Sequence, residues 1–198
     1  MKAHREGKYE KILDAAIEAI SESGYHQCQV TKIARLAGVA DGTIYLYFKS
    51  KEEVLIRVFQ ERMGDFIAFM RRELLQCETT KERLGGIIRT HFSYMEQNRS
   101  LAIFTQLELR QSDPRIRSAV RETILGYYSL IEGVIEQGIE NGEVIETDVR
   151  VARHMIFGFL DEATTDWVMA RSPRSIMRDF ESILALLEGA LRLDEKPK

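Results

Sequence analysis

Apolar residues recur every three or four positions along most of the chain, which is the spacing of an amphipathic α-helix. The first stripe covers residues 9–20 and stops before Gly24, a residue type that often ends helices. Only three prolines occur among the 198 residues, so little interrupts the helical pattern. The pattern predicts an all-α fold of about nine helices.

Two short helices are predicted after the first one. Thr31 precedes an apolar stretch that ends at Gly38, so its hydroxyl is expected to cap a helix of about two turns. A second short helix is expected over residues 43–48. Ser50 followed by Glu53 is typical of a capping box and predicts the start of a long helix. The small core between the short helices is predicted to contain Ile33, Ala37, Val39, Ile44 and Phe48.

The remaining stripes predict the rest of the helices. They cover residues 84–95, 101–110, 116–138, 155–167 and 176–191. Asn141 and Gly142 are expected to end one of these helices, and Asp148 is expected to cap the next. No internal repeat or low-complexity segment occurs.

Composition places the chain among soluble globular proteins, with 44% apolar and 30% charged residues. Residues 1–51 carry 8 basic and 6 acidic residues, a net charge of +2, and the rest carry 20 and 25, a net charge of −5. A polyanion therefore prefers the N-terminal part. The absence of an export signal or a long apolar run favours the cytoplasm and argues against a membrane partner.

No pattern for catalysis or metal binding is found. Cys28 and Cys77 have no second Cys or His at metal-binding spacing. The chain has no glycine-rich phosphate loop, no His-Glu-x-x-His and no nucleophile elbow. We expect no enzyme activity, no catalytic residue, no metal and no cofactor.

The segment from Gly24 to Lys51 carries the most specific motif. It contains Ile-Ala, Ala-Gly-Val and Gly-Thr-Ile-Tyr-Leu-Tyr-Phe in that order, followed by a lysine. This string resembles the N-terminal signature of the TetR family of bacterial transcription regulators. The resemblance implies a TetR-like fold, with a three-helix helix-turn-helix domain over residues 1–51 and a larger ligand-binding and dimerisation domain over residues 52–198. It also implies a homodimer that binds a palindromic operator in double-stranded DNA.

The residue types in this motif suit contact with a DNA backbone. Hydroxyl residues near helix starts and a glycine let phosphates approach closely, tyrosine hydroxyls donate hydrogen bonds, and lysines add charge. A leucine can touch a thymine methyl group. No Arg, Asn or Gln of the second short helix is available for a bidentate base contact, so DNA shape is expected to contribute to specificity. The predicted DNA-binding residues are Thr31, Lys32, Gly42, Thr43, Tyr45, Leu46, Tyr47 and Lys51.

The family also implies that the last two helices pair with those of a second subunit. Gly158 would allow helices to approach closely, and the last helix carries one apolar strip. The alternative is that this strip packs only within its own chain. The strip consists of Ile176, Phe180, Ile183, Leu187 and Leu191.

Three later stretches resemble a narrower group of the family, the acyl-CoA-responsive regulators of fatty-acid degradation. They are residues 101–111, residues 152–158 with Asp161 and Glu162, and residues 167–169. The resemblance implies a repressor of fatty-acid degradation genes that long-chain acyl-CoA releases from its operator. An acyl chain requires apolar, adaptable side chains, and the CoA phosphates require cations. The predicted ligand-binding residues are Arg89, Phe92, Met95, Phe104, Leu107, Arg110, Tyr127, Leu130, Ile131, Phe159 and Trp167.

Other interpretations remain open at this point. A TetR-type repressor that senses a drug or another hydrophobic metabolite fits the same pattern, and so does a DNA-binding protein whose cavity is filled. His91 lies on an apolar helical face, where a hydrogen-bonded core histidine is the more common arrangement. Asp161 and Glu162 are candidates to pair with Arg110 or Arg153, either as part of a switch or as a structural ion pair.

Overall fold

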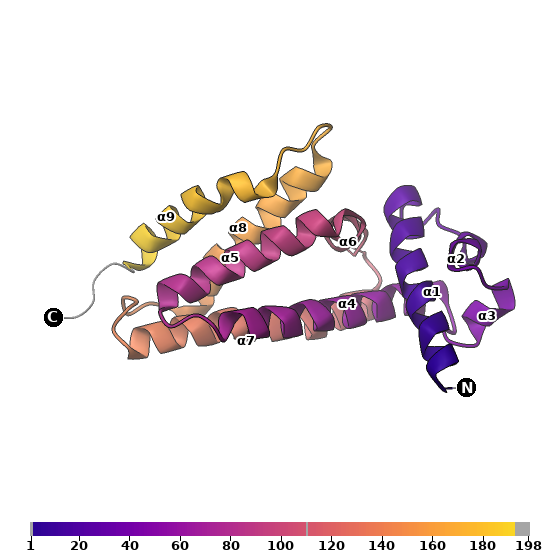
Figure 1. The fold of residues 1–198 in the computed structure, drawn as a ribbon, viewed down its shortest axis with the longest axis horizontal. Helices are drawn as coiled ribbons and strands as arrows, with labels where there is room; N and C mark the ends of the chain where they lie inside the picture. Colours follow the sequence, from indigo (N-terminus) through magenta and orange to yellow (C-terminus); the bar gives the residue numbers. More distant parts are fainter. Residues whose placement is uncertain (1, 110, 193–198) are drawn as a thin grey trace. The chain divides into compact units, whose positions relative to one another are not determined.

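The computed structural model describes residues 2–109 and 111–192, and these residues are mostly helical (Figure 1). No strand occurs within these ranges, and none of their helices is long and apolar enough to cross a membrane. The predicted all-α fold is confirmed. The elements are α1 (Lys2–Ser23), α2 (Val30–Ala37), α3 (Asp41–Tyr45), α4 (Lys51–Leu74), α5 (Thr80–Gln97), α6 (Arg99–Ile103), a π-helix η1 (Phe104–Glu108), α7 (Pro114–Glu140), α8 (Val149–Met169), a 3-10 turn η2 (Ile176–Asp179) and α9 (Phe180–Leu191).

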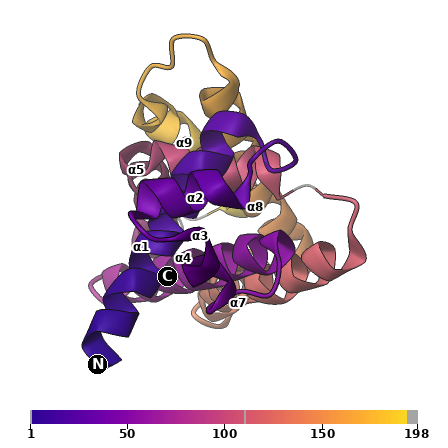
Figure 2. The same cartoon turned by 90° about the vertical axis from the view of Figure 1, so that its right-hand side faces the viewer.

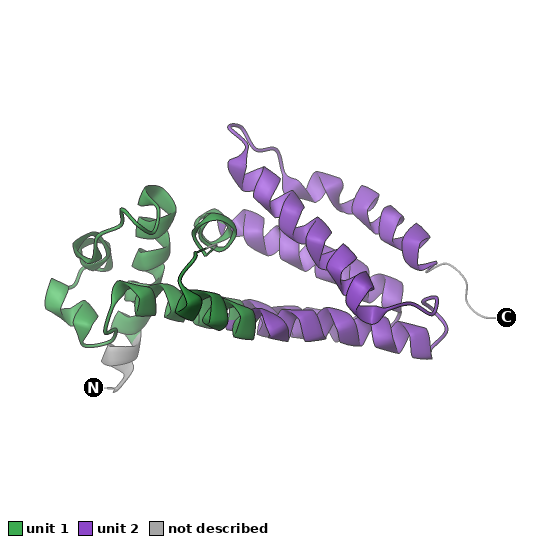
Figure 3. Ribbon diagram, turned by 180° about the vertical axis from the view of Figure 1, so that it is seen from behind, with its two compact units in different colours: residues 1–63, 99–123 green, residues 64–98, 124–198 purple. Residues whose placement is uncertain are grey.

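The chain forms two compact units (Figure 3). The first unit combines residues 1–63 with residues 99–123, and the second combines residues 64–98 with residues 124–198. The helices α4 and α7 therefore each contribute residues to both units. Residues 99–123 belong to the unit of the helix-turn-helix although they lie far from it in the sequence.

In the first unit, α2 packs on α1 and is followed directly by α3 (Figure 2). The helix α1 ends where expected, because Gly24 has φ 76°. The start of α2 differs from the expectation. The carbonyl of Gln29 accepts hydrogen bonds from Lys32 and Ile33, which makes Gln29 the N-cap residue, without a side-chain cap. The prediction that Thr31 is the N-cap is therefore wrong, and its hydroxyl instead donates to the Gln29 side chain at 3.5 Å.

The second short helix also starts earlier than expected. The Thr43 N–H donates to the Ala40 carbonyl at 2.8 Å, so α3 begins at Asp41 and ends at Tyr45, although residues 43–48 were predicted. The Phe48 N–H still bonds to the Ile44 carbonyl, in a turn beyond the helix. The predicted small core is largely confirmed. Ile33, Ala37, Ile44 and Phe48 are buried, and Val39 is half-buried.

The helix starts of the longer elements follow local capping chemistry. The Ser50 hydroxyl accepts from the Glu53 N–H at 3.2 Å, which confirms half of the predicted capping box. The Glu53 carboxylate accepts from Lys49 instead of closing the box on Ser50. Asp148 caps α8 as predicted, since its side chain accepts from the Val151 N–H at 3.1 Å.

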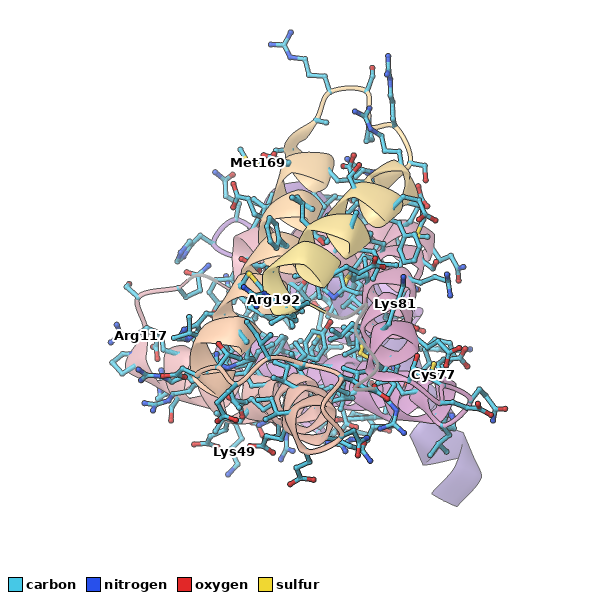
Figure 4. All side chains as sticks on the ribbon, turned by 90° about the vertical axis from the view of Figure 1, so that its left-hand side faces the viewer. Lys49, Cys77, Lys81, Arg117, Met169 and Arg192 are labelled. Atoms are coloured by element: carbon cyan, nitrogen blue, oxygen red, sulfur yellow. The ribbon has the colours of Figure 1, made fainter. Side chains whose placement is uncertain are left out.

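The apolar strip of the last helix packs within its own chain. Phe180 and Leu184 lie against Gly85 of α5, and all five residues of the strip are buried. The expectation that this strip faces a second subunit is therefore wrong, because removing it from its own chain would expose the core. The apolar side chains that α8 and α9 do expose are different ones. They are Val151, Phe159, Met169 and Leu186, of which Met169 is labelled in Figure 4.

Replacing Gly38 with alanine tests the backbone conformation that ends α2. Gly38 has φ 66°, and a Cβ there would meet no atom within 4 Å, so the substitution strains only the backbone. We expect Gly38→Ala to lower the free energy of unfolding by about 1 kcal/mol in urea titrations. Gly42→Ala is the matched control, because Gly42 lies in a helix with equally open space and should lose no stability. Equal losses for both variants would contradict this explanation.

Candidate functional site

The second short helix of the helix-turn-helix, α3, and the residues directly after it present an apolar and aromatic surface. Tyr45 is 59% exposed and Leu46 is 74% exposed. Gly42 is exposed, and a Cβ at its position would meet no neighbouring atom. Thr43 and Tyr47 are half-buried at the same end. An exposed leucine and tyrosine side by side on a tight turn are typical of a surface that a partner covers.

Two of the predicted DNA-binding lysines are engaged within the first unit. The Lys32 ammonium forms an ion pair with Glu22 at 2.9 Å and donates to the Ser23 hydroxyl. The Lys51 ammonium donates to the backbone carbonyls of Tyr25 at 2.9 Å, His26 at 3.1 Å and Cys28 at 3.2 Å. Because an ammonium has three donors, a phosphate contact by Lys51 would replace one of these bonds. Thr31 is exposed on α2.

Two further cations lie exposed on the same unit. Lys49 precedes α4 (labelled in Figure 4), and Arg35 lies in the last turn of α2. The sequence predicted Arg35 only as an auxiliary DNA contact and did not single out Lys49. The position of Lys49 directly after the Tyr-Leu-Tyr-Phe run was the only available signal.

In the second unit, His91 of α5 lies at the centre of a buried polar chain. Its Nδ1 is 3.0 Å from the Tyr127 hydroxyl on α7, and its Nε2 is 3.1 Å from the Thr164 hydroxyl on α8. The Thr164 hydroxyl donates to the Leu160 carbonyl at 2.7 Å, so it accepts from His91 Nε2–H, and Nδ1 accepts from Tyr127. The expectation of a hydrogen-bonded core histidine is confirmed.

The protonation state of this chain follows from its burial. Burial lowers the pKa of His91 to about 3 and raises the pKa of Tyr127. Phe66 packs its ring edge-on against both residues, with centroids 5.7 Å from His91 and 5.5 Å from Tyr127. His91 is therefore neutral, and it joins three helices inside an aromatic environment.

Most of the predicted ligand-binding residues of the second unit are buried around its core. Phe159, at 37% exposure, and Arg89 are the exposed exceptions. The buried ones are Phe92, Met95, Tyr127, Leu130, Ile131 and Trp167. Trp167 also lines a pocket of about 430 Å³ at the connection between α8 and α9, together with Ile176 and Arg178.

The remaining predicted ligand-binding residues lie at a pocket of the second unit, in the first unit, or outside the described residues. Arg89 lines a pocket of about 330 Å³ between α4 and α5, and its guanidinium lies 4.7 Å from the centre of the Phe180 ring. Phe104 and Leu107 belong to the first unit, where Phe104 is buried and Leu107 is 40% exposed. Arg110 lies outside the described residues.

Arg153 has a partner that the sequence analysis did not consider. Its Nε donates to the Glu132 carboxylate of α7 at 2.9 Å, and its guanidinium lies 4.3 Å from the centre of the Tyr128 ring. Arg153 is only 8% exposed and Glu132 is half-buried, so this part-buried pair ties α8 to α7 within the second unit. Such a partner, 21 positions away on another helix, leaves no mark in the sequence.

Family comparisons agree with the motif and the fold. Residues 12–58 match the family described as "Bacterial regulatory proteins, tetR family", and residues 59–190 match the "YsiA-like protein, C-terminal region" of the same family. The chain therefore belongs to the TetR family of bacterial transcription regulators.

Individual relatives extend the similarity to nearly the whole chain. The fatty acid metabolism regulator protein of Bacillus subtilis (strain 168) is 50% identical over 185 residues, which are 93% of this chain and 95% of the relative. The structure of the transcriptional regulator FadR from B. subtilis in complex with stearoyl-CoA has a TM-score of 0.87 at 49% identity, and covers 90% of this chain and 97% of its own. The fatty acid degradation regulator FadR from Bacillus halodurans has a TM-score of 0.88 at 45% identity, covering 93% and 100%.

The buried histidine predicts a specific pH dependence of stability. Unfolded His91 binds a proton below its ordinary pKa of 6.5, and folded His91 does so only near 3. The free energy of unfolding should therefore fall as the pH drops from about 6.5 towards 3, by at most about 1.4 kcal/mol per pH unit from this group. Urea titrations of the parent and of His91→Gln, which cannot titrate, isolate the contribution. Identical pH slopes for the two proteins would contradict the assignment of a neutral, desolvated His91.

Proposed function

We propose that this protein is a transcriptional repressor of fatty-acid degradation genes and that long-chain acyl-CoA releases it from its operator. The observation that carries the proposal is the near full-length similarity, at 49% identity, to a regulator whose structure holds stearoyl-CoA. The helix-turn-helix and the apolar interior of the second unit supply the two halves of this activity.

The DNA-binding half of the proposal rests on the surface of the first unit. Residues 1–51 form the proposed DNA-binding domain, and Thr31, Lys32, Gly42, Thr43, Tyr45, Leu46, Tyr47 and Lys51 are its proposed contacts. The exposed tyrosine and leucine and the open space at Gly42 support a close approach of DNA. Arg35 and Lys49 join this set as exposed cations.

The ligand-binding and dimerisation half is assigned to residues 52–198. The buried apolar and aromatic side chains of the second unit suit an acyl chain, and Arg89 beside a pocket suits the phosphates of CoA. A homodimer is proposed through the exposed faces of α8 and α9, where Val151, Met169 and Leu186 are each more than half exposed. No catalytic step is proposed, and the cytoplasm is the proposed location.

The inducer is tested with a gel-shift titration of the operator complex. We expect stearoyl-CoA and palmitoyl-CoA to release the operator, and CoA alone or the free fatty acid to leave the complex intact. The acyl chain contributes about 0.8 kcal/mol per buried CH₂, and the phosphates add charge-assisted contacts, so neither part alone binds well. An intact complex at acyl-CoA concentrations that demonstrably saturate the protein would refute the inducer assignment.

Arg89→Ala refines that titration. If Arg89 holds a CoA phosphate, the variant should need about tenfold more stearoyl-CoA for release, the effect of one lost charge-assisted hydrogen bond. Arg71→Ala removes an exposed arginine on α4 outside the pocket and serves as the control. A response of Arg89→Ala equal to that of the control would remove Arg89 from the ligand site.

The DNA interface is tested by deleting one hydroxyl. Tyr45 is exposed, so Tyr45→Phe should fold normally and weaken operator binding about tenfold through a lost phosphate hydrogen bond. Because the contact is to the backbone, the loss should be equal for operator variants with single base changes. Tyr128→Phe on α7 is the control, and base-dependent losses for Tyr45→Phe would instead indicate direct base readout.

A further inference from the structure

The backbone of Tyr25 is held by charged side chains from two distant parts of the first unit. Its N–H donates to the Glu108 carboxylate at 2.6 Å, across 83 positions of sequence. Its carbonyl accepts from the Lys51 ammonium, which also lies 4.7 Å from the centre of the Tyr25 ring. Tyr25 is 5% exposed, so both backbone groups are shielded from water and depend on these partners.

The turn at Gly24 makes the carboxylate contact possible. Gly24 has φ 76°, and the two Glu108 carboxylate oxygens lie 3.8 and 3.9 Å from the place a Cβ would occupy. The Gly24 N–H closes the last bond of α1, on the Ile20 carbonyl, so the next N–H, that of Tyr25, is the first one directed away from the helix. Glu108 therefore binds at the point where α1 ends and the helix-turn-helix begins.

The Tyr25 side chain adds a third anchor. Burial together with the neighbouring Glu52 carboxylate raises the pKa of Tyr25 to about 12, so its hydroxyl stays protonated. The neutral ring lies under the Lys51 ammonium at the start of α4. Both backbone groups and the ring of one residue are thus held at once.

Glu108 is presented by an uncommon backbone conformation. It is the last residue of the π-helix η1, which spans Phe104–Glu108 directly after α6. Its own carbonyl accepts from the Gln111 side chain at 2.8 Å. Short π-helical segments are rare and occur frequently at functional sites.

The segment that carries Glu108 is joined at both ends to helices of the other unit. The helix α5, which carries His91, ends at Gln97, and α7 continues from Pro114 into the second unit. A change in either helix can therefore reach η1 along the chain. From this segment, Glu108 reaches the connection between α1 and α2.

We propose that Glu108 is a positioning residue for operator binding: its carboxylate fixes the peptide of Tyr25 and thereby links residues 99–123 to the helix-turn-helix. The inference rests on the proposed function and names the contact through which that function is regulated. With the contact formed, the helix-turn-helix is held in the arrangement that binds the operator. Acyl-CoA lowers operator affinity by favouring an arrangement of residues 99–123 in which this contact is weaker, since a ligand acts only through its differential affinity for two states.

Two substitutions separate the reach of the side chain from its charge. Glu108→Gln keeps the length and an oxygen acceptor but loses the charge. Glu108→Asp keeps the charge but is one CH₂ too short to reach the Tyr25 N–H. We expect Glu108→Asp to weaken operator binding about tenfold and Glu108→Gln to stay close to the parent protein, because the geometry of one hydrogen bond is decisive. Glu122→Ala, which removes an exposed carboxylate of the same unit, is the control.

The decisive measurement is the coupling between the two ligands. The ratio of operator Kd with and without saturating stearoyl-CoA is measured for the full-length parent protein and each variant, and so is the stearoyl-CoA Kd with and without operator. The two ratios must agree for each protein, because coupling is reciprocal. For Glu108→Asp we expect both ratios to shrink at least fivefold, while stearoyl-CoA binding to the DNA-free protein stays unchanged. General damage to the fold would lower that binding too.

The outcomes distinguish the inference from the proposed function. If the parent protein itself shows a ratio of one, stearoyl-CoA is not an inducer and the proposed function fails. If the parent responds and Glu108→Asp shows the same ratio, the positioning role of Glu108 is overturned. A loss in Glu108→Gln together with a normal Glu108→Asp would also overturn it, because charge and not contact would then be responsible. Slower hydrogen exchange of the Tyr25 amide in the parent than in Glu108→Asp is the expected direct signature.

Discussion

Buried backbone groups must find hydrogen-bond partners, and in the first unit this requirement is concentrated in the short connection between α1 and α2. The carbonyls of Tyr25, His26 and Cys28 all accept from one ammonium, that of Lys51. The Tyr25 N–H has Glu108 as its acceptor. The packing of α2 and α3 against α1, and against the start of α4, thus depends on a few charged side chains as well as on apolar contacts.

In the second unit, a buried polar group finds neutral hydrogen-bond partners. The His91 side chain lies among aromatic rings, and its two ring nitrogens form hydrogen bonds with the hydroxyls of Tyr127 and Thr164. The cost of burying a polar group is offset only when all of its bonds are made, so this chain specifies how α5, α7 and α8 align. Such a fixed point matters for the second unit because apolar contacts alone tolerate many alternative packings.

Regulation requires a joint between a ligand-binding part and a DNA-binding part that has more than one arrangement. The described chain supplies the connection that such a joint needs. Residues 99–123 belong to the unit of the helix-turn-helix, yet they connect α5 to the part of α7 in the other unit. A π-helix within this segment is consistent with a backbone that holds a specific side chain in place at the expense of regular geometry.

The sequence by itself determined the helical class, the order of the helices and the family, because amphipathic spacing and residues such as Gly24, Gly38 and Asp148 act through neighbours close in the chain. It located the helix-turn-helix but misplaced its helix starts, since Gln29 and Ala40 cap through backbone carbonyls that any residue type possesses. Only the tertiary structure decided which partners meet across long separations: Glu108 with Tyr25, Lys51 with three carbonyls, and the apolar strip of α9 with α5. The physical reason is that hydrophobic periodicity shows which face of a helix is buried, whereas the element that buries it depends on how the whole chain packs.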